Sequence, residues 1–209
     1  MQPDLLPLFP LTVVLFPRVL MPLHIFEERY KDMIGKAIPG RSEFGIVLSA
    51  EDGVADCGCT AIVEKVVQRY PDGRLDIVVR GKRRFEILDL NTEKPLLRGS
   101  VSFFNDDETN RAEADDLEKA VSGFRKLAGL LHEQPSSEPE WNDPQLSFQL
   151  AQLIPDLEFR QRLLVCRSEA DRIAMLAEFF PQHIDQQRHA AHIKEVAPTN
   201  GHGPSSIVP

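Results

Sequence analysis

The stretch that decides the fold is LLPLFPLTVVLFPRVLMPLHIFEERY, residues 5–30. From Leu5 to Phe26 its only charged or titratable side chains are Arg18 and His24. An apolar run this close to an N-terminus often marks an export signal or a membrane span. This chain, however, begins Met-Gln-Pro-Asp and lacks the basic start that a signal peptide needs.

Four prolines in the same stretch argue against a membrane helix. Such a helix needs about 20 apolar residues with every backbone group bonded internally. Each proline removes one donor and clashes with the preceding turn. The segments Thr12–Phe16 and Val19–Ile25 are rich in β-branched and apolar residues, as strands are. The stretch therefore predicts buried β structure, and we expect no membrane association.

The overall composition predicts a globular protein with an acidic surface. Its 209 residues are 42% hydrophobic, which suits one large domain or two small ones. The net charge of −8 and the pI of about 5.3 disfavour nucleic acid as a partner of the whole protein. Three cysteines are too few for a disulfide framework, which together with the missing signal peptide favours a cytoplasmic location.

Residues 1–104 predict a β-rich subdomain with one helix. The helix is expected over Glu27–Ile38, where apolar side chains recur at helical spacing before Pro39-Gly40. Pro71-Asp72-Gly73 predicts a hairpin turn, because proline presets φ and glycine supplies a positive φ. The further predicted strands are Phe44–Ser49, Thr60–Tyr70, Arg74–Val79, Arg84–Leu90 and Leu96–Phe104.

Residues 105–196 predict a helical bundle, and residues 197–209 a disordered tail. The bundle follows an acidic connector at Asn105–Asp116, and from Leu117 to Leu131 apolar residues recur on one helical face. The other helix signals are a start at Asp143 with Pro144, a segment over Asp156–Cys166, a cap at Ser168 with Asp171, and an expected interruption or kink at Pro181.

Three motifs of the opening stretch follow one pattern. Leu-Pro-Leu-Phe-Pro-Leu is matched by Leu6–Leu11, Val-Leu-Phe-Pro by Val14–Pro17, and Pro-Leu-x-Ile-Phe-Glu-x-Arg-Tyr by Pro22–Tyr30. This pattern closely resembles the start of the substrate-binding, N-terminal domain of Lon proteases. The similarity continues through FGIVLS, CGCTAIVEKV, YPDGRLDIVVRGKRRFEI and FRQRLLVCRSEADRIAMLAEFF, over most of residues 5–185. It implies an α+β fold, with a PUA-like pseudo-barrel of mixed strands and one helix, followed by a C-terminal helical bundle.

The resemblance also implies a function. It indicates a non-enzymatic module that binds exposed apolar segments of unfolded or degradation-bound polypeptides, with a separate protease or chaperone as a further partner. Full Lon proteases continue into an ATPase module and a serine-lysine protease. The present sequence has no GxxxxGK[ST] phosphate loop and ends at Pro209, so we expect a stand-alone domain without enzyme activity or cofactor.

No pattern in the sequence predicts a catalytic or metal site. Cys57 and Cys59 would share one strand face, but zinc needs four ligands, so packing in the core is the favoured interpretation. His183, His189 and His192 lack a carboxylate-flanked motif such as HExxH, which favours surface histidines. No GxSxG motif is present either, although a catalytic triad is recognised by its geometry.

Arg80, Lys82, Arg83 and Arg84 form the one basic cluster of the sequence. Because PUA-like folds elsewhere bind RNA, an RNA-binding module that uses this cluster is the alternative function. The competing interpretation is a charged hairpin corner beside Phe85, which the acidic net charge favours.

Binding of apolar segments requires an exposed apolar groove with a polar rim. The candidate peptide-binding residues are Phe16, Leu20, Phe103, Phe104 and Trp141. A small hydrolase, the third hypothesis, would instead show a polar cleft with perturbed titratable groups.

Overall fold

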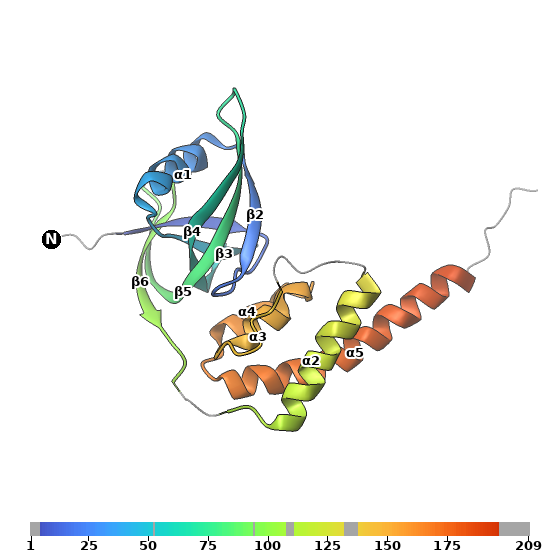
Figure 1. Cartoon of the computed structure of the whole chain (residues 1–209). Coiled ribbons are helices and arrows are strands. Elements are labelled where there is room, and N and C mark those ends of the chain that lie inside the picture. The colour runs from blue at the N-terminus through green and yellow to red at the C-terminus, as the bar shows by residue number, and fades with distance from the viewer. Residues whose placement is uncertain (1–4, 52, 94, 108–110, 132–137, 197–209) are drawn as a thin grey trace, which may run out of the picture.

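The computed structural model describes residues 5–51, 53–93, 95–107, 111–131 and 138–196, with side chains up to residue 189. It consists of a strand-rich half and a helical half, as Figure 1 shows, which confirms the predicted α+β fold. The expected tail at 197–209 lies outside the described residues, and the subdomain boundary between residues 104 and 105 stays a prediction.

The elements follow the order strands, one helix, strands, helices. The strands are β1 (Leu6–Leu11), β2 (Leu20–Ile25), β3 (Phe44–Ala50), β4 (Gly53–Arg69), β5 (Leu75–Asn91) and β6 (Arg98–Phe104). The helices are α1 (Glu28–Gly40), α2 (Ala114–Leu131), α3 (Leu146–Leu150) with the short 3-10 turn η1 (Ala151–Leu153), α4 (Leu157–Val165) and α5 (Glu169–Val196).

The six strands form a mixed sheet that closes on itself. Their order is β2-β5-β4-β3-β1-β6, and β6 pairs in addition with β5. β1 runs parallel to β3 and antiparallel to β6, so the sheet returns to β5 and makes a small pseudo-barrel. Register shifts in the pairing of the long β4 and β5 mark bulges, which let these strands bend around the barrel.

The hairpin between β4 and β5 confirms the predicted turn. Gly73 has a φ of 84° and donates its N–H to the carbonyl of Tyr70 at 3.0 Å. Residues other than glycine rarely adopt this left-handed conformation, so the turn residues and the structure agree.

The prediction of a strand over Thr12–Phe16 is wrong. These residues form a loop that packs across β5 at Gly81, and Phe16 within it is fully buried. A Cβ at Gly81 would lie 2.0 Å from the Phe16 carbonyl oxygen, so the close approach requires glycine. Burial of the segment needs only its apolar side chains and does not require it to pair as a strand.

Three further predictions need correction. Arg74–Val79 and Arg84–Leu90 are one continuous strand, β5, so the basic cluster lies within a strand and not at a hairpin corner. The helix expected to start at Pro144, with Asp143 as its cap, begins two residues later, at Leu146. The last helix continues through Pro181.

The capping signals at two helix starts are confirmed. Asp156 accepts a hydrogen bond from the Phe159 N–H at 2.9 Å, and Ser168 accepts one from the Asp171 N–H at 3.2 Å. Each cap satisfies one of the backbone donors that a helix N-terminus leaves without an intrahelical acceptor.

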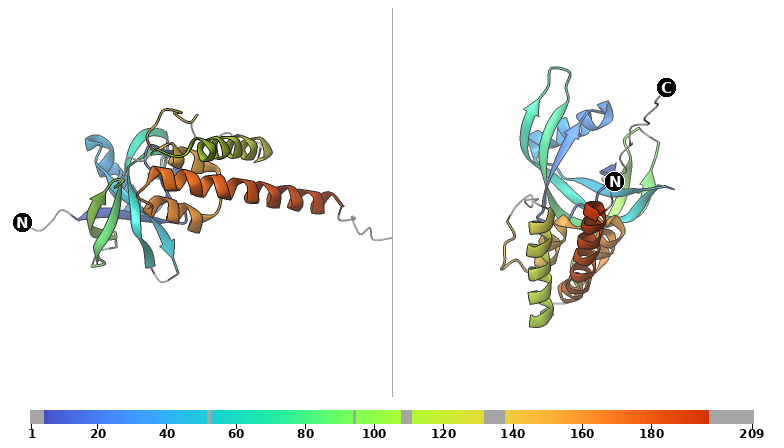
Figure 2. Two further views of the ribbon diagram at one scale, coloured as in Figure 1. Left: turned by 90° about the horizontal axis from the view of Figure 1, so that it is seen from below. Right: turned by 90° about the vertical axis from the view of Figure 1, so that its right-hand side faces the viewer.

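The two halves share one apolar core. The loop residue Phe16 stacks on Phe148 of α3 with ring centroids 5.2 Å apart, which joins the barrel to the bundle. Within the bundle, α2 and α5 lie side by side (Figure 2). At their contact, a Cβ on Gly123 would come within 2.4 Å of the Phe180 side chain, so the two helices approach closely.

Of the candidate cysteines and histidines, Cys57, Cys59 and His183 have defined surroundings in the structure. Cys57 and Cys59 are buried in the core, and burial raises the pKa of each thiol to about 12. His183 stacks on Phe179, and the His192 side chain lies outside the described residues. Across the described ranges, no three His, Cys, Asp or Glu side chains gather so as to hold a metal ion.

In the part of the chain that the structure describes, every helix is too short or too polar to cross a bilayer.

Candidate functional site

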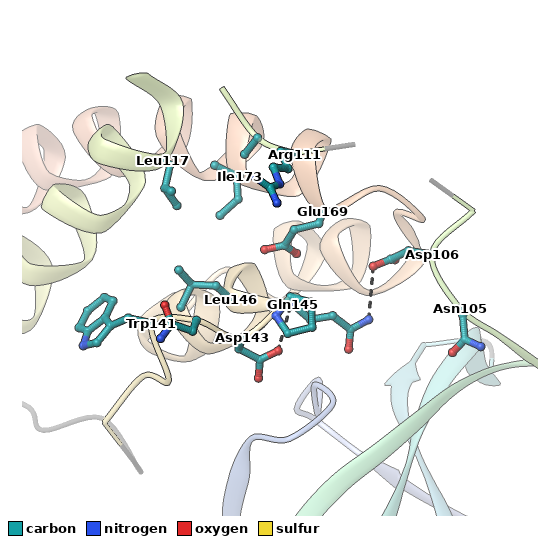
Figure 3. A pocket seen from close by; sticks show the side chains of 13 residues that line it. Asn105, Asp106, Arg111, Leu117, Trp141, Asp143, Gln145, Leu146, Glu169 and Ile173 are labelled. Carbon is teal, nitrogen blue, oxygen red and sulfur yellow. Dashed lines mark hydrogen bonds between the residues drawn. The ribbon is translucent and has the colours of Figure 1, made fainter. Parts of the chain in front are cut away.

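A pocket of about 760 Å³ lies where the linker that follows β6 meets α2, α3 and α5 (Figure 3). We call it the Trp141 pocket. Its walls come from the linker, the first turn of α2, the loop before α3 and the first turns of α5. It therefore sits where the chain passes from the strand-rich half into the helical half.

The pocket has an apolar floor and an apolar mouth. Leu146 and Ile173 are buried, and in Figure 3 Leu117 and Ile173 lie on the side of the pocket that faces Leu146. Leu117 and Trp141 remain 37% and 44% exposed. The Arg125 guanidinium lies 5.0 Å from the Trp141 ring centroid, which supports one face of the ring.

Asp106 forms the polar centre of this region. It accepts hydrogen bonds from Arg84 of β5 at 2.5 Å and from Arg172 of α5 at 2.7 and 2.8 Å. Burial by itself would raise the pKa of Asp106, but the bonds and charges of the two arginines outweigh it and lower this pKa to about 2. Asp106 therefore stays ionised at neutral pH and connects the barrel to the bundle.

Gln145 extends the Asp106 network to the loop before α3. Its side-chain amide donates to Asp106 at 3.3 Å, and its backbone N–H donates to Asp143 at 2.9 Å (Figure 3). Asp143, whose side chain is fully buried, also pairs with Arg18 at 2.8 Å. These donors satisfy the hydrogen-bonding capacity of the buried carboxylate.

Glu169 and Ser147 form a second part of the network. Glu169 accepts from the Ser147 hydroxyl at 2.5 Å and from Arg172 at 2.8 Å. Burial raises the pKa of Glu169, and these donors offset part of the rise. Ser147 is fully buried.

The two pKa shifts of this pocket have different causes, because ion pairs lower the pKa of Asp106 whereas burial raises that of Glu169. The carboxylates of Asp106 and Glu169 face arginines and buried hydroxyl or amide groups, as in an ion-pair network that holds elements together. The carboxylates that line this pocket are therefore held in ion pairs with arginines.

The structure does not bring the five candidate peptide-binding residues together. Trp141 alone of the five lines the pocket. Phe16 is fully buried and so forms no part of an exposed surface. Leu20 is partly buried at the start of β2. Phe103 is 43% exposed beneath Arg83, whereas Phe104 lies between the guanidinium groups of Arg84 and Arg167.

The basic cluster is divided between two environments. Arg84 is 2% exposed and belongs to the Asp106 network. Arg80 pairs with Glu64 at 3.3 Å and Arg83 pairs with Glu43 at 3.0 Å, while Lys82 is exposed. No continuous patch of unpaired positive charge results from these four residues.

Arg172 and Asp106 are the main site residues that sequence analysis missed. Arg172 precedes Leu176 by four residues and thus falls on the same helical face as the buried Ile173, Leu176 and Phe180. A charged residue on an apolar stripe is a signal for a buried ion pair. For Asp106 the local sequence is simply acidic and offers no comparable signal.

Comparisons with known proteins identify the domain. Residues 5–182 match the family model described as the ATP-dependent protease La (LON) substrate-binding domain. The Lon protease of Parabacteroides distasonis is 28% identical over 144 residues, which cover 63% of this chain and 17% of that protein. The Lon protease of Amoebophilus asiaticus is 24% identical over 90% of this chain and 24% of its own length. The chain thus spans less than a third of the length of these relatives.

Solved structures support the same assignment. A Lon N-terminal domain protein from Xanthomonas campestris superposes with a TM-score of 0.67 at 27% identity, over 84% of this chain and 98% of that one. The N-terminal domain of a Mycobacterium avium complex Lon protease shares the fold, with a TM-score of 0.58 at 18% identity over 86% of this chain and all of that one. The protein therefore belongs to the family of the Lon substrate-binding domain, as its opening motifs indicate.

Proposed function

We propose that this domain is a non-enzymatic module that binds exposed apolar segments of unfolded or degradation-bound polypeptides, with one apolar side chain seated in the Trp141 pocket. The observation that carries the proposal is the combination of an apolar floor, an exposed Trp141 at the mouth and carboxylates that already have partners. A separate protease or chaperone that receives the bound polypeptide is part of the same proposal.

Physical chemistry supports an apolar ligand at this place. Covering the exposed parts of Leu117 and Trp141 contributes about 25 cal/mol for each Å² of apolar surface removed from water. Aromatic residues at the rim of a pocket are frequent anchors of binding energy. Because the nearby carboxylates are paired with arginines, an apolar side chain can enter without leaving a charge unpaired.

The single tryptophan allows a direct test. Trp141 is the only tryptophan of the chain, so the intrinsic fluorescence of the protein reports on the mouth of the pocket. A tryptophan-free unstructured peptide rich in Leu and Phe should shift this emission to shorter wavelength, with a dissociation constant on the order of micromolar or weaker. The same peptide with Ser in place of Leu and Phe should cause no shift.

Variants separate the pocket from the rest of the surface. Leu117→Ser should lower the affinity for the peptide, whereas Leu88→Ser, at a leucine that is 67% exposed on β5, should leave it unchanged. Peptide binding that leaves Trp141 emission unchanged would place the site elsewhere. Absence of binding to any apolar unfolded peptide would overturn the proposed function itself.

The RNA-binding alternative has less support. It requires the side chains of the Arg80–Arg84 cluster to form one exposed surface, but Arg84 is buried. Arg80 and Arg83 are each paired with a glutamate. Phosphate contacts need exposed cations that can release counterions.

A further inference from the structure

A second pocket, of about 520 Å³, lies in the strand-rich half between α1 and the sheet. We call it the α1 pocket. Met33 and Ala37 of α1, Phe44 of β3, Pro7 of β1 and Leu96 form its apolar walls. The α1 pocket and the Trp141 pocket share no lining residue, so a ligand of the α1 pocket is independent of the proposed function.

Arg98 places a positive charge in this apolar setting. It pairs in register with Pro7, and cross-strand partners point to the same face of a sheet. Pro7 shares that face with Phe9, whose ring centroid lies 4.0 Å from that of Tyr30 on α1. The Arg98 side chain therefore lies on the face of the sheet that α1 covers, and it lines the pocket.

Among the described residues, no acceptor serves the Arg98 side chain. Its Nε is shut off from solvent without a hydrogen-bond partner, and its guanidinium has no carboxylate within ion-pair distance. A partly buried cation without a partner is unfavourable, and such groups call for an explanation in a native structure. The tip of the guanidinium is the part that a ligand can reach from the pocket.

The other charged groups of the pocket do not supply the missing partner. Glu43 is paired with Arg83 at 3.0 Å, and Glu28 is paired with Lys31 at 2.8 Å. Arg29 is paired with Glu27 at 2.8 Å. Lys36 and Asp32, one turn apart on α1, have opposite charges that cancel in sum. The charge left without compensation is that of Arg98.

We propose that the α1 pocket binds a small apolar carboxylate, whose carboxylate group pairs with the Arg98 guanidinium and whose apolar body packs against Met33, Ala37 and Phe44. Guanidinium and carboxylate form two parallel hydrogen bonds, which are stronger than neutral ones. The pocket volume falls in the usual range of about 300–1,000 Å³ for small-molecule sites. A free aryl or aliphatic acid and the C-terminal residue of a polypeptide both offer this chemistry.

The test compares acids with their neutral amides. Sodium 4-phenylbutyrate and 4-phenylbutyramide form one pair of probes, and the peptide acetyl-Gly-Gly-Leu-Phe with a free or an amidated C-terminus forms the other. Binding is followed by chemical-shift changes of the backbone amides of the ¹⁵N-labelled protein. We expect at least one acid to bind with a dissociation constant on the order of a millimolar, with shifts around α1, and neither amide to do so.

Variants at Arg98 complete the test. Arg98→Met replaces the guanidinium with an apolar side chain of similar length and should lower the affinity for the acid by at least about tenfold. Arg98→Lys should retain part of the affinity. Arg74→Met, on the hairpin and outside the pocket, should bind as the wild type does. The melting temperature of Arg98→Met should equal or exceed that of the wild type, because the variant removes an unpaired buried donor.

The outcomes are distinct. Binding of the free peptide alone assigns the ligand to polypeptide C-termini, and binding of phenylbutyrate assigns it to small acids. Equal affinity for acid and amide, unchanged affinity in a folded Arg98→Met variant, or no saturable shift up to about 20 mM acid would overturn the proposal.

Discussion

The Trp141 pocket and the α1 pocket both contain charged groups, but the state of those groups differs. In the Trp141 pocket, Asp106, Asp143 and Glu169 each accept from an arginine. In the α1 pocket, Arg98 meets no acceptor among the described residues. This contrast is the basis of the two proposals, an apolar group for the first pocket and an apolar carboxylate for the second.

The origin of the arginines explains this difference. The partners of the Trp141 pocket come from distant parts of the chain: Arg18 before β2, Arg84 in β5 and Arg172 in α5. The carboxylates of this pocket therefore acquire their arginine partners when the two halves dock. Arg98 lies within one half, where Glu28 and Glu43 of the same pocket pair with other cations and the Arg98 Nε is buried without a partner. Pairing, and not the number of charged residues, thus decides which ligand a pocket favours.

The largest effect should come from removing the pairing of the Trp141 pocket. Asp106→Asn leaves Arg84 and Arg172, both nearly inaccessible to solvent, without their shared carboxylate. We expect the free energy of unfolding to fall by about 3–5 kcal/mol, measured by urea denaturation. Asp107→Asn, at an exposed carboxylate 3.6 Å from Arg167, should change it by less than about 1 kcal/mol. Similar losses in the two variants would contradict the central role of Asp106.

Acid should weaken the same pairing. The folded pKa of Asp106, about 2, lies below its ordinary value of 3.8, so its contribution is complete above that ordinary value and is lost as the pH falls toward 2. The loss should amount to about 2 kcal/mol. Glu169 acts in the opposite direction, because burial raises its pKa and protonation then favours the folded state.

Denaturation at several pH values checks this prediction. The difference in free energy of unfolding between the wild type and Asp106→Asn should shrink as the pH falls from about 4 to about 2. A difference that stays constant over this interval would show that Asp106 does not titrate there.

An intermediate effect is expected at the mouth of the Trp141 pocket. Trp141→Ala should lower the affinity for an apolar unfolded peptide by about 1–2 kcal/mol, or roughly fivefold to thirtyfold, because it removes the exposed aromatic anchor. Fluorescence anisotropy of a labelled peptide measures this change. Phe26→Ala, at an aromatic residue that is 60% exposed, is the matched control and should leave the affinity unchanged. Binding of apolar carboxylates should be unaffected by both variants if the two pockets are separate.

The smallest effect is expected on the surface of β5. The triple variant Arg80→Gln, Lys82→Gln and Arg83→Gln removes three positive charges and two partly exposed ion pairs. The loss of each ion pair should change the free energy of unfolding by less than about 1 kcal/mol. Peptide affinity should stay the same in this triple variant at low and high salt, since exposed charges are screened beyond about 10 Å at 0.1 M salt.

RNA titrations give the contrary outcome its own signature. RNA binding through this surface would weaken with salt at a slope of roughly −0.7 for each phosphate contact, and the triple variant would flatten that slope. Tight, salt-dependent binding of single-stranded RNA that disappears in the variant would restore the RNA alternative.

Local patterns predict most of the elements for reasons that the structure makes visible. The turn at Pro71–Gly73 and the caps at Asp156 and Ser168 depend on neighbouring residues alone, so sequence is sufficient for them. The apolar run at Thr12–Phe16 predicts burial correctly but strand geometry wrongly, because its conformation depends on the contact with Gly81, 65 positions after Phe16.

The candidate site is less predictable. The sequence identifies Trp141 as an apolar candidate, yet its neighbours in the pocket, Leu117 and Ile173, belong to ordinary helical stripes. Arg84 stands among other basic residues and so resembles a surface cation. Its burial follows from the docking of α4 and α5, which supply the carbonyls of Leu164 and Cys166 and the side chain of Arg172 around it.

The sequence by itself determined the family, the succession of a strand-rich half and a helical half, and the buried character of the opening stretch, since motifs, periodicity and turn residues act over short distances. Only the tertiary structure decided which charges are paired. Asp106 meets Arg84 and Arg172 across separations of 22 and 66 residues, whereas Arg98 meets no acceptor in the described chain. Pairing over such separations depends on how the two halves dock, and no local pattern encodes that geometry.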